Sequence, residues 1–156
     1  MAHPRTVTLL DGTVRFLADA EETEARILLT EQWFPEGPGP PLHTHPMTEV
    51  FHVTEGVVEV LIRPEGADQP EVHRLESGDS HVVPEMAVHT FRPAGEGINK
   101  LIAAFTPVGT GQAFFLDAGS PQEGPMRLPD DPHTDPEAVA EVERAMMRHD
   151  FLIVDQ

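Results

Sequence analysis

The 156-residue sequence contains no cysteine, and it has only 10 basic residues against 27 acidic ones. The absence of cysteine excludes disulfides, thiolate nucleophiles and thiolate metal ligands, so any bound metal must be held by histidine and carboxylate side chains. The formal net charge of −17 repels phosphate backbones and anionic lipid surfaces. We therefore expect neither a nucleic-acid partner nor a membrane partner.

Long apolar runs are also missing. The stretch LLDGTVRFL near the start is interrupted by Asp11, Gly12 and Arg15, and no segment approaches the ~20 apolar residues that a membrane-spanning helix needs. The first 20 residues lack the basic start and apolar run of a secretory signal. These features predict a cytoplasmic protein.

The sequence is rich in residues that end regular structure, with 12 glycines and 16 prolines. Between them lie short segments with strand-like alternation, which favours a closed all-β barrel or sandwich. In the segment 24–34, Ile27, Leu29 and Trp33 are expected to share one face. The expected strands lie within residues 5–17 (two strands with a tight turn at DGT), 24–34, 49–54, 57–63, 71–76, 80–84, 88–92 and 99–106.

The last third of the chain has a different character. Residues 109–119 suggest a short helix or turn, and a linker follows. Asp135 as N-cap and Pro136 at the first helical position predict a helix over about 136–148 that packs outside the barrel. The final FLIV, residues 151–154, predicts a docking strand. We expect a barrel over residues 1–108 and a C-terminal extension over 109–156.

The stretch PLHTHPMTEVF places three potential metal ligands, His43, His45 and Glu49, within seven positions. Side chains two apart on a strand point to the same face, so His43 and His45 can hold one ion. Glu49 would lie about 13 Å from His45 along a straight strand. It can join the site only if the chain bends at Pro46–Thr48, and a proline makes that bend plausible.

A fourth candidate ligand, His89, follows the turn at Pro84–Glu85. Neighbouring strands of a barrel lie about 4.8 Å apart, so His89 can meet His43, His45 and Glu49. Three imidazoles and one carboxylate suit a divalent first-row metal such as Fe, Mn, Ni, Cu or Zn, and contain too much nitrogen for Mg or Ca.

These residues resemble the cupin superfamily. The first cupin motif, G-x5-HxH-x3-E-x6-G, is matched by Gly37, His43, His45, Glu49 and Gly56. The second motif, G-x5-PxG-xx-H-xxx-N, is matched by Gly78, Pro84 and His89, with Met86 in place of its glycine and Pro93 in place of its asparagine.

The remainder of the chain is similar to single-domain bacterial cupins of the quercetin 2,3-dioxygenase-like group, which carry a terminal helix and strand after the barrel. The resemblance implies a cupin-type jelly-roll β-barrel, a dioxygenase-like oxidoreductase activity, and a homodimer formed through exchanged edge strands. An exposed edge at residues 5–17 would also need covering.

Several side chains of the predicted strands are expected to line a substrate pocket around the metal. His81 shares strand parity with Val83 and is expected to point inward too, although a histidine satisfied by backbone or solvent is the alternative. The expected pocket residues are Phe34, Met47, Phe51, Val53, Ile62, His81, Met86 and Phe91.

A metal with open positions would act as a Lewis acid on a small substrate, with O2 or water beside it. Glu49 either stays a ligand or acts as the catalytic general base. With the resemblance, this favours an oxygenase acting on a small aromatic or enolisable metabolite. Two alternatives remain open: a redox-neutral isomerase, cyclase or lyase using the same metal, and a non-catalytic module that binds small molecules.

Overall fold

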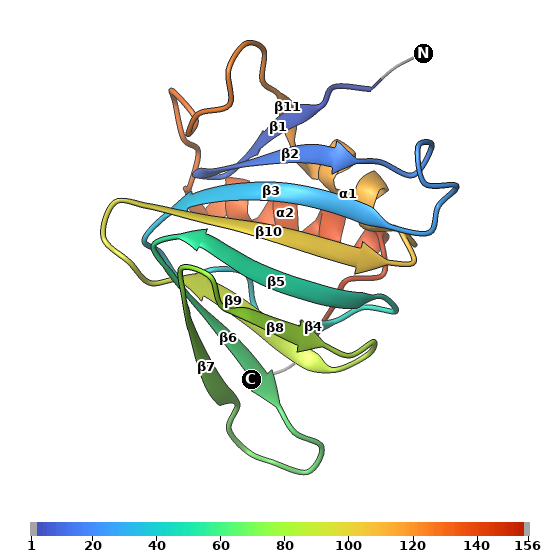
Figure 1. Cartoon of the computed structure of the whole chain (residues 1–156), viewed down its shortest axis with the longest axis vertical. Helices are drawn as coiled ribbons and strands as arrows, with labels where there is room; N and C mark the ends of the chain where they lie inside the picture. The colour runs from blue at the N-terminus through green and yellow to red at the C-terminus, as the bar shows by residue number, and fades with distance from the viewer. Residues whose placement is uncertain (1–2, 155–156) are drawn as a thin grey trace.

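Antiparallel strands in two sheets form most of the regular structure of this protein, whose computed structural model describes residues 3–154 (Figure 1). The two sheets face each other as in a cupin-type jelly-roll barrel. The seven-stranded sheet consists, in spatial order, of β11 (Ser120–Pro121), β1 (Thr6–Leu9), β2 (Gly12–Ala18), β3 (Leu28–Pro35), β10 (Ile98–Thr106), β5 (Thr48–Glu55) and β8 (Ser80–Val83). The five-stranded sheet consists of β12 (Leu152–Ile153), β4 (His43–Thr44), β9 (Val88–Pro93), β6 (Val57–Arg63) and β7 (Glu71–Glu76).

Alternation along the central strands explains how the sheets close around a core. On β5, Glu49, Phe51 and Val53 are buried, while the residues between them are more exposed. On β10, Leu101 and Phe105 belong to the same buried face. Because successive strand side chains point to opposite faces, this pattern gives each sheet an inner, apolar side. The all-β prediction is confirmed.

The inner face of β3 carries polar as well as apolar side chains. The strand begins at Leu28, and its buried positions are Leu28, Thr30 and Gln32. Leu29 and Trp33 do share a face, but it is the outer one, where the Lys100 ammonium group lies 4.2 Å from the Trp33 ring. Two polar residues therefore project into the interior from the middle of this strand.

The C-terminal segment adds two helices and completes both sheets. Helix α1 spans Gly111–Ala118, and α2 spans Pro136–Arg148, with the Asp135 carboxylate accepting a 2.9 Å hydrogen bond from the N–H of Ala138. Helix α2 lies outside the strands and covers the barrel from behind β3 and β10 (Figure 1), with Ala145 and Met146 buried. Strands β11 and β12, which lie beyond residue 108, pair with β1 and β4 of the two sheets. The expected domain boundary at residue 108 stays a prediction.

The edge at β1 is partly covered from within the chain, because β11 pairs with Val7 and Thr8. Because this edge is partly covered, it gives less reason to expect a homodimer than the sequence suggested. The dimer stays a prediction. Neither helix in residues 3–154 has the length and apolarity to cross a bilayer.

Candidate metal centre and its cavity

A bend between two strands brings the HxH pair to Glu49. Strand β4, which begins at His43, belongs to the five-stranded sheet, whereas β5, which begins at Thr48, belongs to the seven-stranded one. The chain crosses between the sheets at residues 45–47, as the proline there suggested. His43 is directly opposite His89 in the pairing of β4 with β9. Ligand candidates far apart in sequence thus meet at one end of the barrel.

The three histidines are oriented by the main chain. Nδ1 of His43 lies 2.8 Å from the carbonyl oxygen of Pro41, Nδ1 of His89 lies 2.8 Å from that of Ala87, and Nδ1 of His45 lies 3.0 Å from that of Met47. A carbonyl only accepts hydrogen bonds, so each Nδ1 carries the proton. Each Nε2 is then left with a free lone pair, the arrangement found in metal-binding histidines.

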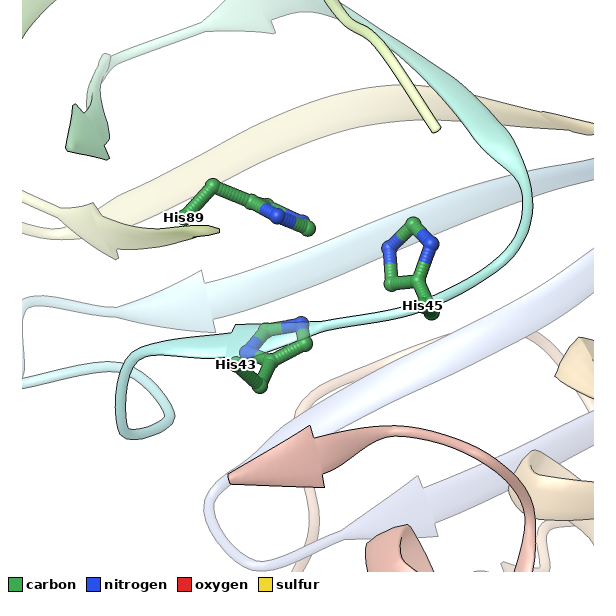
Figure 2. A group of neighbouring side chains, drawn as sticks. All are labelled: His43, His45 and His89. Atoms are coloured by element: carbon green, nitrogen blue, oxygen red, sulfur yellow. The ribbon is translucent and has the colours of Figure 1, made fainter. Parts of the chain in front are cut away.

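The rings of His43, His45 and His89 gather around a common space between their strands (Figure 2). Ligand atoms of His43, His45 and His89 all lie within 4.8 Å of one another, and all three side chains are buried. Oε1 of Glu49 lies 3.1 Å from Nε2 of His45 and 3.4 Å from Nε2 of His89. Nε2 of His89 is the one fully buried side-chain nitrogen or oxygen in residues 3–154 that lacks a hydrogen-bond partner.

The electrostatics of this group keep it in the form that binds cations. Burial, reinforced by the neighbouring His89, lowers the pKa of His43 to about 3. Burial alone would raise the pKa of Glu49, but its contacts with His45 and His89 outweigh that effect and lower the pKa to about 2. At neutral pH, His43 is therefore a neutral imidazole and Glu49 a carboxylate. An orphaned buried nitrogen among these donors fits a divalent first-row metal.

A cavity of about 410 Å³ opens from this centre into the barrel. His43, Glu49 and His89 form its inner end, so a bound metal would face the cavity. This volume lies near the lower end of the range for small-molecule sites. Most of the wall is apolar; the walls include Leu9, Phe34, Phe91, Phe105, Phe114, Phe115, Val139, Val142, Met146 and Phe151.

Two of the expected pocket residues, Phe34 and Phe91, line this cavity, and their ring centroids lie 5.5 Å apart. Met47, Phe51 and Val53 point inward as expected but are wholly buried in the core and do not line the cavity. Ile62 packs against the same core and does not line it either. For these four residues the pocket role stays a prediction that the lining of this cavity does not support.

Met86 and His81 lie away from the cavity, which corrects their expected placement. Met86 is 53% exposed, because the turn it occupies lies on the surface. His81 does share a face with Val83, but it lies on the edge strand β8, where its ring stacks on that of His73 at 4.1 Å. The pKa of His81 is lowered by its partial burial and by His73.

The sequence-based reasoning missed several residues of the site. Gln32 lines the cavity, and its parity with Phe34 was the available signal. Phe151 packs its ring 5.1 Å from that of His45 and 6.0 Å from that of His43. Helix α2 contributes Met146 and Glu143 to the cavity wall. No sequence pattern revealed that the C-terminal segment walls the site.

Comparison with known proteins agrees with this geometry. The family model described as "Cupin domain" matches residues 31–105, which include all four candidate ligands. No curated protein gives a significant match to the chain.

Solved structures with the same fold include an RmlC-like cupin from Shewanella frigidimarina, 21% identical, with a TM-score of 0.53, covering 65% of this chain and 82% of that one. KdgF from Halomonas sp. is 23% identical, with a TM-score of 0.51 and coverages of 62% and 79%. A mutant of Bacillus subtilis oxalate decarboxylase is 18% identical, with a TM-score of 0.58, covering 67% of this chain and 27% of that one. At these identities the likeness establishes the fold alone.

Proposed function

We propose that this chain, which has the cupin fold, is a metal-dependent oxygenase acting on a small aromatic or enolisable metabolite, with His43, His45, Glu49 and His89 as ligands of a divalent transition metal. The observation that carries the proposal is the shared orientation of the three histidines. Every Nδ1 lies against a main-chain carbonyl, which turns each Nε2 toward the shared site, where that of His45 lies 3.1 Å from the Glu49 carboxylate and that of His89 has no hydrogen-bond partner. A buried group of this kind is costly unless a cation satisfies it.

The metal, when bound, would supply Lewis acidity that favours the ionised form of a substrate hydroxyl or enol. The side chains of the protein would position the substrate and exclude water from it. Phe34 and Phe91 offer aromatic surface to a flat substrate, and the apolar wall keeps bulk water from the inner end. Glu49, held as a carboxylate, can accept a proton from the substrate if it leaves the metal.

Metal analysis of the purified protein tests the site. We expect about one equivalent of a first-row metal in the wild type, and roughly a tenfold or greater loss in the His45→Ala and His89→Ala variants. His52→Ala is the matched control, because His52 lies on the same strand as Glu49 but faces outward and contacts Ser80 at 2.7 Å. If neither cavity variant loses metal, the ligand assignment is wrong.

Oxygen uptake with a panel of flavonols and catechols, after loading with Fe(II), Mn(II), Ni(II) or Cu(II), tests the reaction. Uptake matched to product formation supports an oxygenase. Turnover without oxygen would instead indicate a redox-neutral isomerase, cyclase or lyase. Saturable binding without turnover under every metal would leave a non-catalytic binding module.

A further inference from the structure

The end of the cavity remote from the metal centre carries a distinct set of polar groups. Strand register gives its position. Glu49 is aligned with Phe105, and Phe105 with Leu28 on β3. Gln32 lies four residues farther along β3, about 13 Å from that level. Phe34 follows it on the same strand, with its ring 5.5 Å from that of Phe91, which lies two residues beyond His89 on β9. The cavity therefore has a metal end, an apolar middle and a second polar region.

Gln32 is the buried polar side chain of this second region. It is 3% exposed and lines the cavity. Thr30 donates its hydroxyl hydrogen to the carbonyl oxygen of Ala103 at 3.0 Å, so its oxygen can only accept from Nε2 of Gln32, also at 3.0 Å. This chain fixes the amide orientation and leaves Oε1 of Gln32 with no hydrogen-bond partner among the described residues. Oε1 of Gln32 is therefore an acceptor on the cavity wall that a donor of a ligand can reach.

The charged groups that line the cavity outside the candidate ligands, Asp11, Glu36 and Glu143, are all acidic. Asp11 precedes Gly12, and a Cβ on Gly12 would lie 2.3 Å from the Phe34 ring, which places Asp11 at the level of Phe34. Glu143 reaches the cavity from α2. Neither carboxylate has an ion-pair partner within residues 3–154, although the arginines of α2 pair with other acids. Burial without a cation raises the pKa of Asp11.

No arginine or lysine lines the cavity among the described residues. A site that bound a carboxylate or phosphate away from the metal would need such a cation or a cluster of N–H donors. Here Gln32 offers an acceptor oxygen, while Asp11 and Glu143 offer negative charge. A ligand with a carboxylate at this end would meet like charges on half-buried side chains.

We propose that the cavity rejects substrates whose end remote from the metal carries an anion and accepts those whose remote end is uncharged or cationic, such as one with a hydroxyl or an ammonium group. The proposal rests on the proposed function, since it assumes that the other end of the substrate lies at the metal. It narrows that function to a class of substrate: uncharged or amine-bearing, with a flat apolar body.

Three catechols that differ only in the remote group test the proposal: dopamine with an ammonium, 4-ethylcatechol with no charge, and 3,4-dihydroxyphenylacetate with a carboxylate. Their binding to the zinc-loaded protein is measured by calorimetry without oxygen, since zinc is redox-inert and does not turn the catechols over. We expect dopamine and 4-ethylcatechol to bind roughly tenfold or more tightly than the carboxylate probe. Comparable affinity of the carboxylate probe and 4-ethylcatechol would overturn the proposal.

The double variant Asp11→Asn, Glu143→Gln assigns the selectivity to the cavity. The double variant should retain zinc. In it, the affinities for dopamine and 3,4-dihydroxyphenylacetate should differ by roughly threefold or less. The matched control is Glu21→Gln, Glu65→Gln, which changes the net charge equally at two exposed positions. If the control variant reduces this difference in affinity as much, the selectivity comes from the overall charge of the protein and the proposal fails. If no catechol binds a protein that holds zinc, the proposed function fails too.

Discussion

The backbone N–H of Met86 donates a 2.9 Å hydrogen bond to the carbonyl oxygen of His45. This bond ties the turn before His89 to the HxH segment, so two ligand-bearing stretches are held together by main chain. Met86 occupies the left-handed region, with φ of 64°, at the position where the second cupin motif has glycine. The departure from the motif has preserved the turn, at the cost of a side chain in a strained conformation.

Met86→Gly should therefore stabilise the protein. Removing the Cβ relieves about 1–2 kcal/mol of left-handed strain, while the greater freedom of glycine in the unfolded chain offsets about 0.5–1 kcal/mol. The net expectation is a rise in Tm of roughly 1–2 °C by differential scanning calorimetry. Met86→Ala keeps the Cβ and should give no such rise. If both variants raise Tm equally, the stabilisation comes from loss of the methionine side chain and not from relief of backbone strain.

Thr30→Val should destabilise the protein, because it removes the hydroxyl that links Gln32 to Ala103 inside the barrel. The buried amide of Gln32 would lose its acceptor, which costs about 1–2 kcal/mol and lowers Tm by roughly 2–6 °C. Thr54→Val is the control, since the exposed Thr54 hydroxyl makes a longer bond, 3.2 Å, to Lys100. A loss no larger than that of the control would show that the chain of hydrogen bonds does not hold Gln32.

Asp19→Asn should lower Tm at neutral pH but not in acid. The backbone N–H of Glu22, His3 and Arg5 all stabilise the carboxylate and lower the pKa of Asp19. Since the folded pKa is below the unfolded one, the stabilisation is present above about pH 4 and is lost as the pH falls through the folded pKa. We expect a Tm difference of roughly 2–4 °C at neutral pH that closes as the pH falls through the folded pKa of Asp19. A constant difference across a pH series would refute the assignment.

Zinc should raise the thermal stability of the wild type. Binding to the folded state alone contributes about 2.7 kcal/mol when free metal is 100-fold above Kd, or roughly 5–10 °C in Tm. Chelation should reverse the rise. In His89→Ala the shift should vanish, whereas His52→Ala should keep it. An undiminished shift in His89→Ala would mean that the ion binds elsewhere.

The ligand set was accessible from the sequence because its spacing is local and demanding. His43, His45 and Glu49 are only six residues apart, and a short turn precedes His89, so strand parity and one bend suffice to predict their meeting. Their roles as ligands stay predictions until a metal is measured. The strand pattern likewise predicted the all-β fold, since glycine and proline bound nearly every strand.

The cavity wall was less accessible, because alternation says which side chains point inward but not how deep they lie. Phe51 and Val53 face inward yet are sealed in the core, whereas Phe34 reaches open space. Gln32 was overlooked because polar residues are not expected on an inner face. The contribution of Phe151 depends on a pairing between β12 and β4 across more than a hundred residues, for which the sequence carries no local signal.

The three imidazoles are held in place by carbonyl oxygens at positions 41, 47 and 87. Every amino acid carries that oxygen, so replacing Pro41, Met47 or Ala87 can alter a side chain without deleting the acceptor. Substitutions at these three positions should therefore leave the tautomers of the three imidazoles unchanged.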